Sequence, residues 1–99
     1  MIKVEVTKKN ISIHGHAMYD DFGKDIVCAA VSSIITTSVE SIAAFDRTAI
    51  DAKEVQNGLD ISINKFDDIT TKLIATMLNL LNELAKKYPK NIKITNKEE

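Results

Sequence analysis

The amino-acid sequence predicts a mixed α/β domain of the α+β type, with the element order ββαββαβ and a mostly antiparallel sheet that packs two helices on one face. Short segments near the start, middle and end of the chain alternate apolar and polar residues, which is typical of half-buried strands. Two longer segments, residues 25–45 and 67–88, space their apolar residues three and four apart, which is typical of helices on a sheet.

The N-terminal segments IKVEV and ISI predict two antiparallel strands. Ile2, Val4 and Val6 fall on one side of the first segment, and Ile11 and Ile13 continue the alternation in the second. The polar stretch TKKN between them is a hairpin signal, because it separates two alternating runs with residues that suit a turn. We therefore expect the domain to open with a β-hairpin.

A second hairpin is predicted in the middle of the chain, where the dipeptide Asn57-Gly58 separates two strand-like runs. Asn-Gly is the strongest short-range hairpin signal, because both residues adopt positive φ easily. Leu59, Ile61 and Ile63 alternate after it and are expected to face inward. A last short strand, NIKIT, completes the predicted sheet.

The first predicted helix covers residues 25–45, with Asp25 as its N-cap. Its apolar stripe consists of Val27, Val31, Ile34, Ile35, Ile42 and Phe45. One sheet face does not cover a stripe this wide, and a self-complementary patch is the commonest way for a small protein to bury the excess. The wide apolar stripe of this helix therefore predicts that the protein forms a homodimer.

The second predicted helix begins after a cap, Asp67 or Asp68, and runs to about residue 88. Pro89 ends it, because proline has no N–H to donate and its ring clashes with the preceding turn. Its buried stripe is expected to consist of Leu73, Met77, Leu80, Leu81 and Leu84.

Length and charge restrict the class of protein. The 99 residues suit one domain, expected over residues 1–95, with a frayed tail at 96–99. The 13 basic and 14 acidic residues give a formal charge of −1, which argues against direct nucleic-acid binding by phosphate neutralisation. Lysines that gather late in the chain suit a helix C-terminus and a solvated strand face.

The single cysteine and the hydropathy pattern indicate a reducing compartment. One thiol forms no internal disulfide, and no group of Cys, His, Asp and Glu has the spacing of a zinc site, so we expect neither metal nor cofactor. The first residues lack the apolar core of a signal peptide, and no apolar run approaches the length of a membrane span. We expect a cytoplasmic protein that does not bind membranes.

The candidate chemistry is concentrated in HGHAMYDDFGKDIVCAAVSS, which holds both histidines and the only cysteine. Cys28 falls in the first turn of the first helix, where free N–H groups and the helix dipole stabilise a thiolate. The dipole contributes at most about 2 kcal/mol, so full activation of a thiol also needs a histidine. The alternative is a small buried hydrophobe, the most frequent role of a lone cysteine in an apolar helix.

His16 is the preferred partner of the thiol. With Ile11 and Ile13 facing the core, His14 points to the opposite side of the strand, whereas Gly15 lets the backbone turn before His16. The loop that follows is polar and contains glycine, which suits a segment that closes over a bound peptide. Its candidate substrate residues are Gly15, Ala17, Tyr19, Phe22 and Gly23.

Two further residues are candidates for supporting roles. Ser32 lies one helical turn after Cys28 and could donate a hydrogen bond there. Asp25 lies one turn before Cys28 and either orients His16 or only caps the helix, of which the cap is the commoner role. A lone histidine is usually structural, so the residues by themselves leave a catalytic and an inert interpretation open.

Two motifs carry a resemblance to a known family. GHA at residues 15–17, followed after a polar loop by GKDIVCAAVSSI at residues 23–34, resembles the ribosomal-processing cysteine protease family, Prp. The likeness extends through the opening hairpin, the NGL hairpin and a second helix that ends in YP before a strand. It implies His16 as general base and Cys28 as nucleophile, and Asp25 and Ser32 match as well.

The resemblance also implies a partner and a reaction. It implies a homodimeric endopeptidase that removes the N-terminal extension of a large-subunit ribosomal protein. A different class stays open, namely a non-catalytic, ribosome-associated peptide-binding module in which the cysteine is structural. Thiol labelling separates the two, because a packed thiol resists iodoacetamide and a catalytic one reacts quickly near neutral pH.

Overall fold

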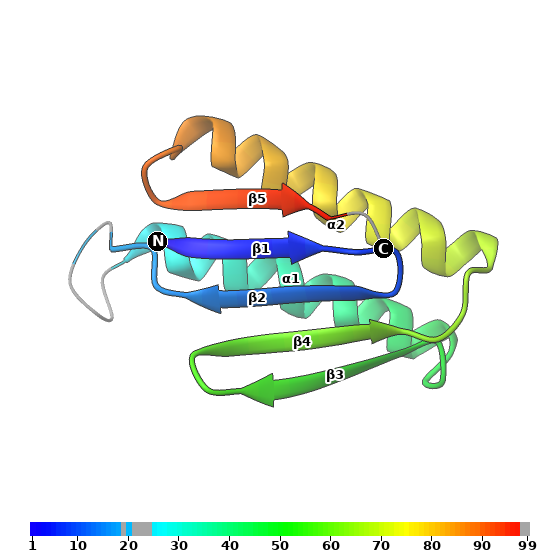
Figure 1. Cartoon of the computed structure of the whole chain (residues 1–99). Coiled ribbons are helices and arrows are strands. Elements are labelled where there is room, and N and C mark those ends of the chain that lie inside the picture. Colours follow the sequence, from blue (N-terminus) through cyan, green and yellow to red (C-terminus); the bar gives the residue numbers. More distant parts are fainter. Residues whose placement is uncertain (19, 21–24, 98–99) are drawn as a thin grey trace.

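Within residues 1–18, 20 and 25–97, which the computed structural model describes, five strands form one sheet and two helices lie on one of its faces (Figure 1). The elements in chain order are β1 (Ile2–Val6), β2 (Asn10–Gly15), α1 (Ile26–Phe45), β3 (Ile50–Val55), β4 (Gly58–Ile63), α2 (Asp68–Lys87) and β5 (Ile92–Asn96). The predicted order ββαββαβ is confirmed.

The strand order across the sheet is β3-β4-β2-β1-β5. β1 with β2, β2 with β4 and β3 with β4 pair antiparallel, whereas β1 and β5 pair parallel. The parallel pair arises because α2 connects β4 to β5 as a crossover, so that β5 runs in the direction of β4 and β1. The sheet is therefore mixed but mostly antiparallel, as predicted.

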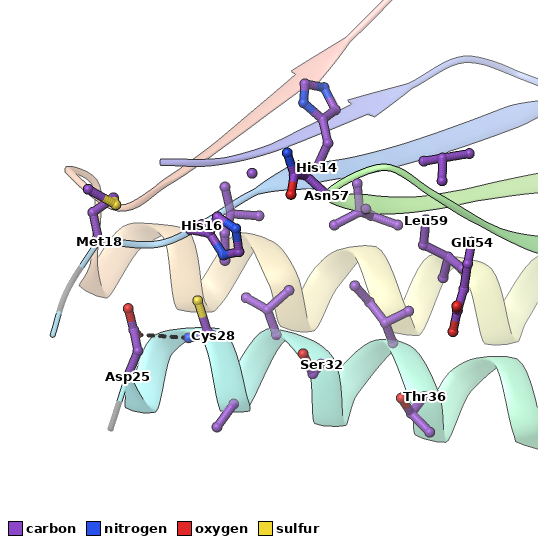
Figure 2. Close-up of a pocket in the computed structure, with 18 of the residues that line it drawn as sticks. His14, His16, Met18, Asp25, Cys28, Ser32, Thr36, Glu54, Asn57 and Leu59 are labelled. Atoms are coloured by element: carbon purple, nitrogen blue, oxygen red, sulfur yellow. Dashed lines mark hydrogen bonds between the residues drawn. The ribbon is translucent and has the colours of Figure 1, made fainter. Parts of the chain in front are cut away.

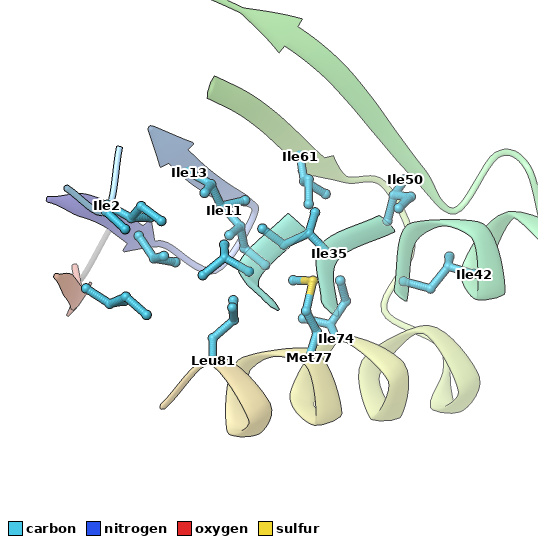
Figure 3. Close-up of a cluster of buried hydrophobic side chains, with 14 of the residues drawn as sticks. Ile2, Ile11, Ile13, Ile35, Ile42, Ile50, Ile61, Ile74, Met77 and Leu81 are labelled. Carbon is cyan, nitrogen blue, oxygen red and sulfur yellow. The ribbon is translucent and has the colours of Figure 1, made fainter. Parts of the chain in front are cut away.

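The core lies between the sheet and the helices (Figure 3). Val4, Ile11 and Ile61 come from three adjacent strands, and each side chain is fully buried. Met77 and Leu81 of α2 meet them from the other side and are buried as well. Because burying one such side chain contributes about 1.5–3 kcal/mol, this layer accounts for the alternating pattern of the strands.

α1 begins after the predicted N-cap, Asp25, but buries a narrower stripe than expected. Its buried residues are Val27, Val31, Ile35 and Ile42. Ile34 is partly buried, whereas Phe45, the last residue of the helix, is 67% exposed, so its place in the buried stripe was wrong. α2 covers the rest of the sheet face, so α1 buries only the arc that faces the sheet and its neighbour.

α2 begins after its N-cap, Asp67, which accepts a 2.9 Å hydrogen bond from the N–H of Thr70. The helix ends two residues before Pro89, as predicted. Its buried residues are Thr70, Ile74, Met77 and Leu81. Leu80 is 43% exposed, so its assignment to the stripe was wrong. At 100° per residue it is turned away from the arc that contains Met77 and Leu81.

α1 is long and apolar enough to cross a membrane by length and composition alone, with a mean hydropathy of 1.7 over 18 residues. This corrects the expectation that no apolar run reaches such a length. The criterion is weak evidence, because the core helix of a globular domain also meets it. Four α1 side chains here form part of the core under the sheet.

The turn between β3 and β4 lies one residue earlier than the Asn-Gly signal indicates. Val55 pairs with Gly58, so the turn residues are Gln56 and Asn57, and Asn57 has a φ of +61°. Gly58 is the first residue of β4, where a Cβ atom would lie 2.1 Å from the carbonyl oxygen of Ile13. The close approach of β2 therefore requires this glycine.

The C-terminal pairing continues past residue 95. β5 runs to Asn96, and the N–H of Lys97 donates a 2.7 Å hydrogen bond to the carbonyl oxygen of Val6. The sheet thus holds two residues that the sequence assigns to the tail, and residues 98–99 lie outside the part that the structure describes.

Candidate active site

A groove of about 860 Å³ opens between α1, the end of β2 and the β3–β4 hairpin (Figure 2). One side of it is formed by α1 through Cys28, Ser32 and Thr36, which follow one another at intervals of one helical turn. His16, at the end of β2, and Leu59, from β4, line the opposite side. The groove therefore places the only thiol of the chain opposite a histidine.

Cys28 is held by the capping interaction at the start of α1. The Oδ1 of Asp25 accepts hydrogen bonds from the N–H groups of Val27 and Cys28, both at 3.0 Å. The side chain of Cys28 is half-buried and packs against the edge of the core, whereas Val31, one turn further along α1, is buried under the sheet. Asp25 thus caps the helix as predicted and fixes the backbone of Cys28.

The segment after β2 contacts the thiol through its backbone. The N–H of Ala17 donates a hydrogen bond to the Sγ of Cys28 at 3.3 Å. Ala17 itself is fully buried, and its carbonyl oxygen accepts a 2.8 Å hydrogen bond from the side-chain amide of Asn91. A residue far along the chain therefore fixes the peptide unit that touches the sulfur.

Gly15 explains how the chain leaves β2 toward this position. Its φ is +96°, and a Cβ atom there would lie 2.3 Å from the carbonyl oxygen of Met1. Its N–H donates a 2.9 Å hydrogen bond to the carbonyl oxygen of Asn57. The backbone can turn here only because glycine tolerates this conformation and has no side chain.

His16 is exposed, lines the groove and lies on the side opposite Cys28 (Figure 2). The two side chains share no hydrogen bond, and the sulfur accepts from Ala17 instead. Catalytic hydrogen bonds often tighten only when substrate binds.

His14 is one of the residues that line the groove, but its ring extends toward Glu5 on the other face of the sheet, as the strand alternation predicts. Its Nε2 lies 3.2 Å from the Oε1 of Glu5, and the Nζ of Lys97 lies 2.6 Å from the Oε2. Hydrogen bonds from Lys97 and from His14 hold the pKa of Glu5 below its usual range. This histidine therefore belongs to a polar cluster on the other face of the sheet.

The structure adds groove residues that the sequence did not indicate: Met18, Thr36, Glu54, Asn57 and Leu59. The Asn-Gly signal predicts the hairpin but not its position beside α1, which depends on the strand order. Ser32 lines the groove one turn from Cys28, and its proposed hydrogen bond is not formed. Tyr19, Phe22 and Gly23 lie outside the described residues.

The cysteine protease Prp family model matches residues 1–93 of this chain. A ribosomal processing cysteine protease Prp from Mycoplasma pneumoniae is 34% identical over 95 residues, which cover 93% of this chain and 91% of the relative. The corresponding protein from Mycoplasma genitalium is 32% identical over 96 residues, with coverages of 95% and 94%.

The fold is similar to a solved structure from Staphylococcus aureus. A crystal structure of the essential ribosomal processing protease Prp, in complex with a covalently linked product peptide, superimposes with a TM-score of 0.91. The two chains are 27% identical, and the likeness covers 98% of this chain and 100% of the other. A second structure of that protein, with a substrate peptide, gives a TM-score of 0.84 at 26% identity.

Proposed function

Because this chain belongs to the cysteine protease Prp family, we propose that Cys28 is its nucleophile and His16 its general base. The observation that carries the assignment is that the only thiol lies in the first turn of a helix and opens into the same groove as His16. A thiol at a helix start is favoured as a thiolate, since the dipole and the nearby N–H groups stabilise negative charge.

The reaction follows from these two groups. His16 takes the proton of the thiol, and the sulfur attacks the carbonyl carbon of the scissile bond. An S–C bond forms and the C–N bond breaks, while His16 gives the proton to the leaving amine. Water, deprotonated by His16, then cleaves the thioester and releases the acid and the free thiol.

The backbone contact from Ala17 has a defined role in this scheme. Its N–H points at the sulfur, so it stabilises negative charge on the thiolate by a charge-assisted hydrogen bond. The N–H groups of Val27 and Cys28 are held by Asp25. The negative charge of Asp25 is therefore stabilised by these N–H groups, which reduces its repulsion of a thiolate at Cys28.

The proposed substrate is the N-terminal extension of a large-subunit ribosomal protein. Ribosomal processing is the function in the names of the relatives, and the S. aureus relative has been seen with a substrate peptide. An extended peptide fits a groove that is open along α1. We further propose that the enzyme acts as a homodimer in the cytoplasm, where ribosomal proteins are made.

The test is incubation of the protein with N-terminally extended ribosomal proteins of the large subunit, followed by intact-mass analysis. Loss of a short N-terminal fragment from one of them is expected. The Cys28→Ala variant should leave every candidate at full mass. Unchanged masses with the folded wild-type protein contradict the proposed substrate, and cleavage by Cys28→Ala contradicts the proposed nucleophile.

A further inference from the structure

Glu54 of β3 points into the groove (Figure 2). Ile50, Ala52 and Glu54 alternate onto the same side of the strand, and Ile50 is 7% exposed in the core. Ala52 and Glu54 are both exposed, so this side of β3 leaves the core after Ile50 and carries Glu54 at the groove.

The carboxylate of Glu54 is exposed, and among the residues that the structure describes it makes neither a hydrogen bond nor an ion pair. The nearest wall, α1, contains no lysine or arginine over its whole length. Within residues 1–18, 20 and 25–97, no basic Lys or Arg side chain lines the groove. The charge of Glu54 is therefore hydrated and accessible to a ligand that enters the groove.

The distance along the groove fixes where such a ligand group would sit. Glu54 lies toward the Thr36 end of the groove, and Thr36 follows Cys28 by eight residues (Figure 2). Eight residues of α-helix advance about 12 Å. An extended peptide advances about 3.3 Å per residue, so this length corresponds to three or four residues.

We infer that Glu54 is a specificity-determining residue that pairs with a lysine or arginine side chain three or four residues from the scissile bond of a bound peptide. This inference rests on the proposed function, because Cys28 marks the scissile bond. An exposed ion pair contributes less than about 1 kcal/mol, so Glu54 selects among peptides by a factor of about two to five.

The test uses peptides that carry the wild-type cleavage site, with acetylated N-termini so that only side chains supply charge. Each of the four positions on either side of the scissile bond is set in turn to Lys, Gln or Glu, and kcat/KM is measured. For wild-type protein, Lys should exceed Gln by about two- to fivefold at a position three or four residues away. The ratio of kcat/KM for the Lys peptide to that for the Gln peptide should fall toward one in 0.5 M NaCl, because salt screens exposed charges.

Two variants and a control connect this preference to Glu54. Glu54→Gln should abolish the preference for Lys, and Glu54→Lys should reverse it in favour of Glu. Glu83→Gln removes the same charge from an exposed position on α2 that does not line the groove, and should keep the wild-type preference. An equal response to Lys and Gln at all eight positions, or a preference that survives Glu54→Gln, overturns the inference.

The inference remains testable if the proposed function fails. A wild-type protein that cuts no peptide contradicts the catalytic proposal alone. Fluorescein-labelled forms of the same peptides are then titrated against Cys28→Ala and the double variant Cys28→Ala/Glu54→Gln, and binding is followed by polarisation. Tighter binding of the Lys peptide to the first variant only supports the role of Glu54, and equal binding to both rejects it.

Discussion

The side-chain amide of Asn91 donates a hydrogen bond to the carbonyl oxygen of Ala17 across 74 positions of sequence. The N–H of Ala17 in turn donates to the sulfur of Cys28. Asn91 touches neither the thiol nor the groove, so its effect on the site passes through one peptide unit. It is a positioning residue, and its contribution can be separated from that of the reacting groups.

Replacing Asn91 by Asp should lower kcat about tenfold with little change in KM, because the carboxylate cannot donate to the Ala17 carbonyl. Asn91→Ala should have the same effect. Stopped-flow alkylation of Cys28 and steady-state cleavage measure it. Asn82→Ala is the control, since Asn82 bonds only within α2. An unchanged kcat in both Asn91 variants contradicts the positioning role.

Cys28→Ala and His16→Ala should separate catalysis from folding. Cys28→Ala deletes one half-buried sulfur and introduces a good helix former, so stability should change by about 1 kcal/mol or less while cleavage disappears. His16→Ala should retain the thiol and cut about 10²- to 10⁴-fold more slowly. Urea denaturation and cleavage assays measure both. A Cys28→Ala protein that fails to fold supports the structural role of the thiol instead.

Gly58→Ala should destabilise the protein by about 2 kcal/mol or more, because the added Cβ meets the backbone of β2 at 2.1 Å. Asn57→Gly, at the neighbouring position with φ +61°, should change stability by less than about 0.5 kcal/mol. Thermal unfolding of the two variants gives the comparison. Equal melting temperatures contradict the close approach of β2 and β4.

Acid should weaken the fold in part through Asp46. Hydrogen bonds from Lys65, and then from Thr48, lower the pKa of Asp46 from 3.8 to about 2. A carboxyl with a lowered pKa in the folded state stabilises it above about pH 4, and this contribution is lost as the pH falls toward 2. The free energy of unfolding, measured with urea, should therefore depend less on pH between 4 and 2 for Asp46→Asn than for the wild type. The control variant Glu83→Gln should show the same pH dependence as the wild type.

A dimer should be detectable by light scattering at micromolar concentration. Ile26 and Phe45, at opposite ends of α1, are 57% and 67% exposed, and a second copy is the expected cover for such apolar surface. Ile26→Ser and Phe45→Ser should each shift the mass toward that of a monomer. A monomer mass for the wild-type protein at this concentration would contradict the prediction.

The alternating strands and the two caps could be predicted from the sequence because they depend on local rules. Ile2, Val4 and Val6 alternate regardless of what lies beside them, and the side chain of Asp25 caps α1 by accepting hydrogen bonds from N–H groups two and three residues ahead. The exposure of Phe45 and Leu80 could not be predicted, because it depends on how two helices divide one sheet face.

The same division holds for the candidate site, where local motifs predict some residues and long-range contacts bring in the others. The spacing of His16 and Cys28 indicates that a loop joins them, and the structure places both in one groove. Asn91 and Glu54 carry no local signal, because the partner of Asn91 and the groove beside Glu54 come from segments that meet only through the strand order. Long-range pairing is the information that a single sequence does not display.

The position of Asn91 also has a consequence for the timing of activity during synthesis. Cys28 and the GHA segment leave the ribosome more than 60 residues before Asn91 does, at roughly 5–20 residues per second. Until β5 pairs with β1, the peptide unit at Ala17 lacks the anchor that points its N–H at the sulfur. In a nascent chain the surroundings of the thiol therefore stay incomplete for several seconds after Cys28 has been synthesised.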